Sequence, residues 1–179
     1  MARIPYREAS GAPERVKELL AKNKGANIFR MMSHAEAAFE PYLRLGNALL
    51  FKGQLDPKLR EMAIVRVGQL CGAPYEVVAH EKIAGDVGLP AEKITAIGQG
   101  SRAKLWTPLE RDVLRLAEEM VVMKRGAPGT VEMLHKGLGA RALTELVMSI
   151  GYYLLTSTFL ETLGIDMEAE LKVPEKRRG

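Results

Sequence analysis

Apolar residues recur along most of this chain at three- and four-residue intervals, the spacing that gathers them on one face of an α-helix. The run from Ile28 through Phe39 to Leu50 predicts a helix over residues 28–51, with a break or kink at Pro41. No alternating strand pattern of useful length is present, so the sequence predicts an all-α fold. Further helices are predicted over residues 14–21, 57–70, 74–87, 90–97, 108–123, 131–136 and 140–163, with a loop at 98–100.

Capping residues mark several of these helix ends. The Asp-Pro pair at 56–57 and the Thr-Pro pair at 107–108 each supply a side-chain cap followed by a proline suited to the first helical turn. Glu110 stands where a capping box has its acid, and Gly164 is placed to close the last helix.

Two predicted helices are apolar on more than one side. The helix over 57–70 has apolar residues on nearly all faces and belongs in the interior. The last helix has no charged residue from Leu146 to Leu160, a run too short to span a bilayer and too apolar for an ordinary surface helix. We therefore predict that it packs against another subunit of an obligate oligomer. Gly151 either permits close helix approach or occupies a core position without room for a Cβ.

Length and charge limit the possible partners. With 179 residues and 47% hydrophobic content, the chain fits one domain. Its net charge of +4 comes from interspersed basic and acidic residues, and the basic cluster at 176–178 resembles a solvated tail, so we predict no nucleic-acid partner. The single Cys71 excludes an internal disulfide, and neither a signal peptide nor a membrane span is evident, which predicts a soluble, cytoplasmic protein.

The segment from residue 60 to 80 carries the candidate chemistry. Glu76 and His80 are four residues apart on one predicted helix, so a carboxylate and an imidazole lie within hydrogen-bond reach. Glu61 falls on the buried face of the preceding helix, where an acid needs a partner or a proton. The alternative is purely structural: an exposed Glu–His pair, with Glu61 in an ion pair to Arg60 or Arg66.

Other binding chemistry has weaker support. His34 and His135 stand alone, without a second ligand at metal spacing, and no glycine-rich phosphate motif is present. A metal held by Glu61, Glu76 and His80 stays open as an alternative, but the sequence predicts no metal and no cofactor.

The pattern Arg-Glu at 60–61, Tyr-Glu at 75–76, His80 and Gly-Leu-Pro at 88–90 closely resembles the carboxymuconolactone decarboxylase family, of the alkylhydroperoxidase D-like superfamily. The resemblance covers residues 40–165, which leaves 1–39 as an N-terminal helical extension and 166–179 as a tail. It implies an alkylhydroperoxidase D-like helical bundle and a homotrimer or homohexamer.

In the peroxidase branch of that superfamily, two cysteines three residues apart precede the histidine. The matching positions here are Ala73 and Glu76, and neither residue can supply the attacking thiolate or the resolving thiol that a dithiol peroxidase needs. Cys71 lies two residues before the first of them, where a small buried apolar side chain is the expected role. Dithiol peroxidase activity is therefore predicted to be absent.

Resemblance to the decarboxylase branch implies a cofactor-free lyase or isomerase acting on a small organic acid or lactone. In this hypothesis His80 is the general acid or base, Glu76 orients it, and Glu61 is a second proton-transfer group or an electrostatic partner. Tyr75 either donates a hydrogen bond to a developing oxyanion or simply packs. Arg60 and Arg66 are predicted to point away from the face of Glu61. The second hypothesis is a non-catalytic oligomeric helical protein, a binding or stress-related module, in which the same residues close a buried polar network.

Overall fold

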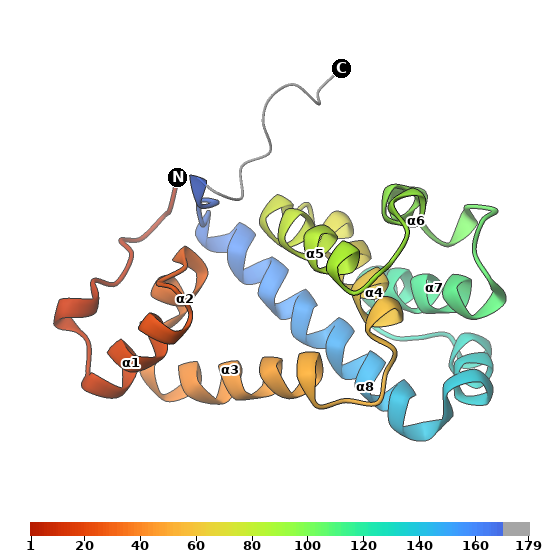
Figure 1. Ribbon diagram of the computed structural model, residues 1–179, viewed down its shortest axis with the longest axis horizontal. Coiled ribbons are helices and arrows are strands. Elements are labelled where there is room, and N and C mark those ends of the chain that lie inside the picture. Colours follow the sequence, from red (N-terminus) through yellow and green to blue (C-terminus); the bar gives the residue numbers. More distant parts are fainter. Residues whose placement is uncertain (170–179) are drawn as a thin grey trace, which may run out of the picture.

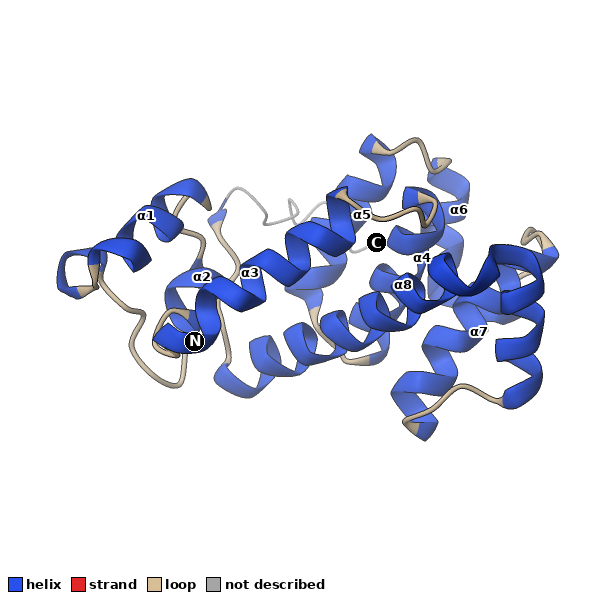
Figure 2. Cartoon of the chain, turned by 90° about the horizontal axis from the view of Figure 1, so that it is seen from below, coloured by secondary structure: helices blue, strands red, loops and turns tan. Residues whose placement is uncertain are grey.

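The computed structural model describes residues 1–169 of the chain, and in this part every regular element is helical. Figures 1 and 2 show one long helix crossing the molecule, with shorter helices packed along it. The all-α prediction is confirmed. The elements, in chain order, are a 3₁₀ turn η1 (Ala9–Gly11), α1 (Glu14–Lys22), α2 (Asn27–Met32), α3 (Glu36–Phe51), α4 (Pro57–Leu70), α5 (Pro74–Asp86), α6 (Ala91–Ala96), a 3₁₀ segment η2 (Ile97–Arg102), α7 (Pro108–Met123) and α8 (Pro128–Leu163).

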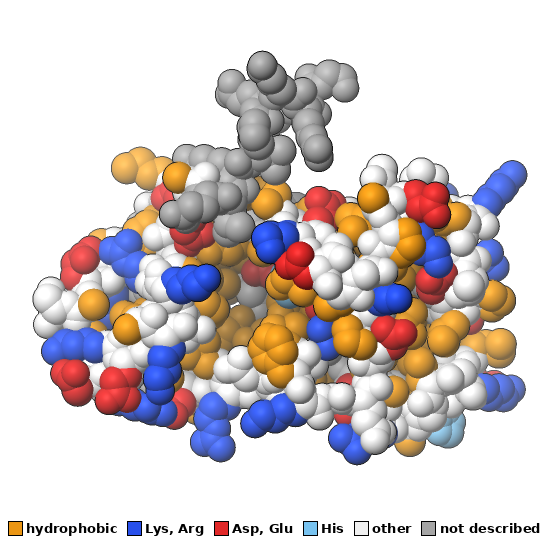
Figure 3. All heavy atoms as spheres, in the orientation of Figure 1, with side chains coloured by type: hydrophobic (Ala, Val, Ile, Leu, Met, Phe, Trp, Pro, Cys, Tyr) orange, Lys and Arg blue, Asp and Glu red, His pale blue; other side chains and the backbone are white. Residues whose placement is uncertain are grey.

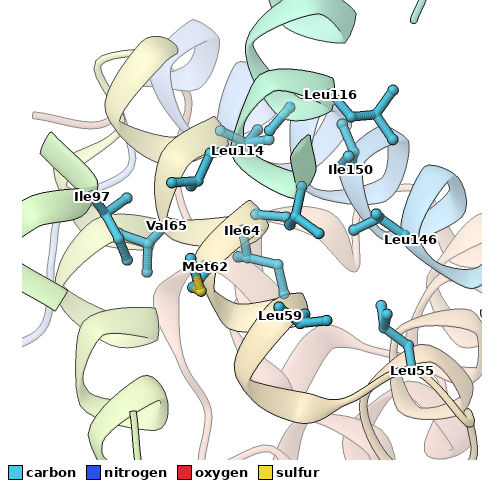
Figure 4. Packing of buried hydrophobic residues seen from close by; sticks show 14 of the residues in the cluster. Leu55, Leu59, Met62, Ile64, Val65, Ile97, Leu114, Leu116, Leu146 and Ile150 are labelled. Atoms are coloured by element: carbon cyan, nitrogen blue, oxygen red, sulfur yellow. The ribbon is translucent and has the colours of Figure 1, made fainter. Parts of the chain in front are cut away.

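Helix α4 lies at the centre of the main core, where it contacts α5, α7 and α8. Its residues from Met62 to Val65 are fully buried, which confirms the interior position predicted from its all-round apolar character. Figure 4 shows Met62, Ile64 and Val65 surrounded by side chains from the neighbouring elements, among them Leu114 of α7 and Ile150 of α8.

The N-terminal helices form a second hydrophobic cluster. Residues of α1, α2 and α3 pack there with Tyr75 of α5 and Leu160 near the end of α8. In Figure 1 these three helices lie to one side of α8, away from α6 and α7. The N-terminal region is thus joined to the rest of the fold through apolar contacts with α5 and α8.

The predicted helix over 28–51 is two helices, and its interruption lies at residues 33–35 rather than at Pro41. At the break, the Ser33 hydroxyl donates to the carbonyl of Arg30, and Arg7 donates to the carbonyl of Ser33. These bonds satisfy backbone groups at the end of α2. Pro41 lies inside α3, where its missing N–H is tolerated because the buried neighbour Phe39 anchors the helix.

Residues 98–100, predicted as a loop, belong to the 3₁₀ segment η2. The Trp106 indole N–H donates to the Gly100 carbonyl, and the Glu118 carboxylate accepts from the N–H and hydroxyl of Ser101. Gly100 has φ +67°, which a glycine adopts without strain. Bonds from Trp106 and Glu118 therefore hold a segment that is 3₁₀-helical on either side of a break at Gly100.

The remaining helix ends agree with the sequence. Asp56 and Thr107 cap α4 and α7 through their side chains, and Thr107 and Glu110 form the reciprocal capping box. The predicted pair of C-terminal helices is present as one element, α8, broken in backbone geometry at Gly139 with φ +76°. Gly164 ends it in the left-handed conformation.

Helix α8 is long and apolar enough to cross a membrane by length and composition alone, but 44% of its most apolar window is buried in the fold. The core helix of a soluble protein has these properties. Its outer face exposes Val147, Met148 and Leu155, and a Cβ on Gly151 would meet only open space, so the reading of Gly151 as a crowded core position is wrong. The oligomer stays a prediction.

Candidate active site

The turn between α4 and α5 brings the candidate residues together. Cys71 ends α4, Gly72 turns the chain with φ +65°, and Pro74 opens α5. Gly68 lets the two helices approach closely, because a Cβ there would lie 3.1 Å from Val77 and 3.3 Å from Glu76. The resulting antiparallel pair places Glu61 of α4 opposite His80 of α5.

A buried network joins three side chains. His80 Nδ1 lies 2.6 Å from Glu61 Oε2, and Arg60 Nε donates to Glu61 Oε1 at 2.9 Å. Glu61 is fully buried, and Arg60 and His80 are almost fully buried. Glu61 therefore has both partners that a buried acid requires.

This network corrects the prediction for Arg60. Arg60 does not point away from Glu61, because its guanidinium folds back to the carboxylate of the adjacent residue. Their ion pair is buried, contrary to the surface or interface pair considered from the sequence. Arg66 pairs instead with Glu118 at 2.8 Å, outside this network.

Glu76 does not form the hydrogen bond to His80 that the sequence predicted. Its Oε2 lies 3.4 Å from His80 Nε2 but makes no hydrogen bond to any described residue, although the side chain is buried. The carboxylate that holds the imidazole is thus Glu61, not Glu76. Burial raises the pKa of Glu76, and the charge of Glu61 raises it further, while His80 opposes the shift.

The raised pKa predicts how Glu76 affects stability. A carboxyl group whose pKa is higher in the folded state stabilises the fold below its ordinary pKa of about 4.5, and this contribution is lost as pH rises through the raised value. We expect Glu76→Gln to unfold at higher urea concentration than the wild type above neutral pH, with the difference shrinking toward pH 4. Urea unfolding across this pH range measures the effect, and Glu92→Gln, at an exposed position of α6, is the matched control. A pH-independent difference would contradict the assignment.

A cavity of about 350 Å³ lies beside His80 and Glu76, and both residues line it. Its wall is built from both parts of the fold: Phe29 of α2, residues of α3 including Asn47, α5, and Tyr152 of α8. Glu61 is not part of the wall and supports His80 from behind. Figure 3 shows a hollow on this face whose floor and sides are mostly hydrophobic.

Three tyrosines that the sequence did not single out as site residues line the cavity together with His80. The rings of Tyr42 and Tyr152 stack with centroids 4.5 Å apart, and Tyr153 packs edge-on against His80 at 4.6 Å. Burial raises the pKa of Tyr42 to about 12 and that of Tyr153 well above its ordinary value, so both phenols stay neutral at physiological pH. Tyr152 and Tyr153 lie in the uncharged run of α8, which already marked that stretch of sequence as unusual. No sequence pattern pointed to Tyr42.

Tyr75 lines the cavity, but its hydroxyl donates to Glu168 at 2.9 Å. That bond occupies the proton an oxyanion would need, which favours the packing interpretation of Tyr75. Phe29 lines the cavity, whereas Met32 and Phe39 are buried in the N-terminal cluster.

The remaining candidates lie elsewhere or gain no support. Cys71 is partly buried against the main core, and burial raises the pKa of its thiol. His34 and His135 are exposed. In residues 1–169 no three His, Cys, Asp or Glu side chains are arranged to hold a metal ion, so the alternative of a metal at Glu61, Glu76 and His80 gains no support. The basic cluster at 176–178 lies outside the described residues.

Solved structures define the class of protein. An uncharacterized peroxidase-related protein with an alkylhydroperoxidase AhpD core, from Ralstonia eutropha JMP134, superposes with a TM-score of 0.82 at 19% identity, covering 97% of this chain and 98% of the other. The debrominase Bmp8 in complex with 2,3,4-tribromopyrrole gives 0.78 at 16% identity, with 96% of each chain covered. The fold is therefore that of the alkylhydroperoxidase D-like proteins.

Sequence comparison gives the family. The sequence model of the carboxymuconolactone decarboxylase family matches residues 36–119. The uncharacterized protein YnjA of Escherichia coli K12 is 30% identical over 132 residues, which are 70% of each chain. This protein belongs to the carboxymuconolactone decarboxylase family. The finer boundaries at 40–165 stay a prediction.

Proposed function

We propose that this protein is an acid–base enzyme, a lyase or isomerase, that moves a proton on a small carbonyl compound such as a lactone or an organic acid. One observation carries the proposal: a ligand-sized cavity is lined by a buried histidine and by a buried carboxyl group that has no hydrogen-bond partner among the described residues. Unsatisfied buried polar groups are costly, and a substrate would satisfy this one.

The geometry suggests a role for each side chain. With Nδ1–H donating to the Glu61 carboxylate, His80 keeps the lone pair of Nε2 for the cavity. Nε2 would take a proton from a carbon next to a carbonyl group, and the C–H electron pair would form the enolate. In its protonated form, which the raised pKa favours, Glu76 would donate a hydrogen bond to the enolate oxygen.

Two outcomes follow from the enolate. In an isomerisation, Nε2–H returns the proton to a different carbon. In a decarboxylation, His80 enters protonated: the C–C bond breaks, its electron pair forms the enolate as carbon dioxide leaves, and Nε2–H then protonates the carbon. Both sequences use the same three side chains and need no dithiol.

The sequence argues against peroxidase chemistry of the two-cysteine kind, since Ala73 and Glu76 occupy both positions. Hydroperoxide turnover that disappears in a Cys71→Ser variant would overturn this exclusion.

Proton exchange tests the proposal without knowledge of the natural substrate. We expect the wild type in D₂O to accelerate exchange of protons next to the carbonyl group of at least one member of a panel of small lactones and ketones, followed by NMR. The panel compounds alone give the background rate. A panel that binds to the cavity without any enzyme-dependent exchange would contradict the acid–base assignment.

The non-catalytic alternative requires a sealed and fully hydrogen-bonded network. The open cavity and the unpartnered Glu76 oxygen favour catalysis over it. The cytoplasmic location is proposed on the sequence features given above, and the homotrimer or homohexamer on the family resemblance alone.

A further inference from the structure

The cavity wall has an unusual charge balance for a site that would take an organic acid. Among the described residues that line it, none is a lysine or an arginine. Arg60 belongs to the buried network behind His80, where Glu61 already accepts from its Nε. Acids are instead close by: Glu76 is in the wall and Glu61 lies behind His80.

A carboxylate entering this cavity would lose its water without gaining a guanidinium or ammonium partner. Recognition of anions in proteins ordinarily uses arginine, lysine or a cluster of backbone N–H groups. Glu61 lies behind His80 with its charge already paired to Arg60, so it offers an anion no attraction. The cavity therefore disfavours an anion.

The rest of the wall suits a flat ring. Tyr42, Tyr152, Tyr153, Phe29 and Phe51 bring aromatic side chains to it. Two of the tyrosine hydroxyl groups already have hydrogen-bond partners. The Tyr42 hydroxyl bonds to the hydroxyl of Thr156, and Thr156 donates in turn to the Tyr152 carbonyl. The Tyr152 hydroxyl donates to the Tyr42 carbonyl. The wall therefore offers a ligand mainly the faces and edges of aromatic rings, with few free polar groups. Aromatic faces and edges pack well against other planar rings.

We propose that the ligand of this cavity is a neutral, planar, unsaturated ring that carries an oxygen acceptor. Of the organic acid and the lactone, the structure selects the uncharged lactone, for which the isomerisation of the proposed function is open and the decarboxylation is not. The acceptor oxygen lies against Glu76, whose free oxygen needs a partner and whose protonated form supplies the donor. This inference rests on the proposed function for the place of the site, but it concerns binding and has its own test.

Two matched ligand pairs test the selection. Coumarin is compared with coumarin-3-carboxylate, and 2-pyrone with 2-pyrone-5-carboxylate, by titration calorimetry at neutral pH, where both acids are ionised. We expect the neutral member of at least one pair to bind about tenfold more tightly than its carboxylate or better, because the anion lacks a cationic partner. Equal affinities, tighter binding of the carboxylates, or no binding of either neutral ring would overturn the proposal.

A charge placed at the cavity provides a second, independent readout. Asn47 lines the cavity and is exposed on α3, so Asn47→Arg should fold normally. We expect this variant to bind the carboxylates about tenfold more tightly, relative to their neutral counterparts, than the wild type does. Thr95→Arg adds the same charge at an exposed position of α6 and should change neither affinity. Unchanged carboxylate binding in Asn47→Arg would contradict the inference that carboxylates bind weakly because the cavity wall lacks a lysine or arginine.

These measurements separate the two proposals. Tight binding of a neutral ring without proton exchange supports the ligand class and contradicts the proposed function. Proton exchange on a carboxylate that binds better than its neutral counterpart supports the proposed function and overturns the ligand class.

Discussion

Replacing His80 by Gln is expected to lower the enzyme-dependent proton-exchange rate by about 10²–10⁴-fold, the usual contribution of a positioned acid–base group. Glutamine has a similar reach and an amide that can still donate to Glu61, so the buried carboxylate keeps a partner. It cannot carry a proton between substrate positions. Exchange rates by NMR in D₂O, at saturating substrate, measure the effect on the chemical step.

The control for this variant is His135→Gln, which makes the same change at an exposed position of α8. It should retain the wild-type exchange rate. Circular dichroism and size-exclusion chromatography of both variants show whether the fold and the assembly are kept. Wild-type exchange by a folded His80→Gln protein would remove His80 from the mechanism.

Replacing Glu61 is expected to have the largest effect on stability. Glu61→Ala leaves Arg60 buried without its carboxylate and removes the acceptor for His80 Nδ1, which should lower the free energy of unfolding by about 3–5 kcal/mol. Glu61→Gln keeps the shape and one acceptor oxygen, so its loss should be smaller. Urea unfolding at one fixed protein concentration gives the order, because assembly would otherwise shift the midpoints.

Glu132→Ala is the matched control, since Glu132 forms an exposed ion pair with Lys136 on α8. Such pairs contribute little, and its unfolding curve should stay close to that of the wild type. If Glu61→Ala were as stable as Glu132→Ala, the buried network would have no structural role.

Local sequence signals were sufficient for most of the helical fold. Helix α4 was predicted from its all-round apolar pattern, and the ends of α4 and α7 from capping residues that bond within one turn. The break after α2 was misplaced, since Arg7 and Ser33 stabilise it through contacts that helical spacing does not encode. Pro41 was given too much weight, because the packing of α3 overrides one missing backbone bond.

The site was predicted as a group of residues but not as a geometry. Spacing of four residues favoured Glu76 as the partner of His80, yet the partner at hydrogen-bond distance is Glu61, from another helix. Helical periodicity gives direction around one axis and says nothing of how two helices face each other. Tyr42 was missed for the same reason, since its place beside Tyr152 depends on the packing of α3 against α8.

The cavity draws its wall from the segment that matches the family and from residues on either side of that segment. The proton-transfer group lies on α4 and α5, inside the matched segment, whereas Asn23, Ala26, Ile28 and Phe29 lie before it and the lining residues of α8 lie after it. Substitutions in the N-terminal helices would therefore reshape one part of the wall for a new compound while the histidine and its supporting acid stay in place. Grafting this N-terminal section between relatives offers a way to exchange selectivity and retain reactivity.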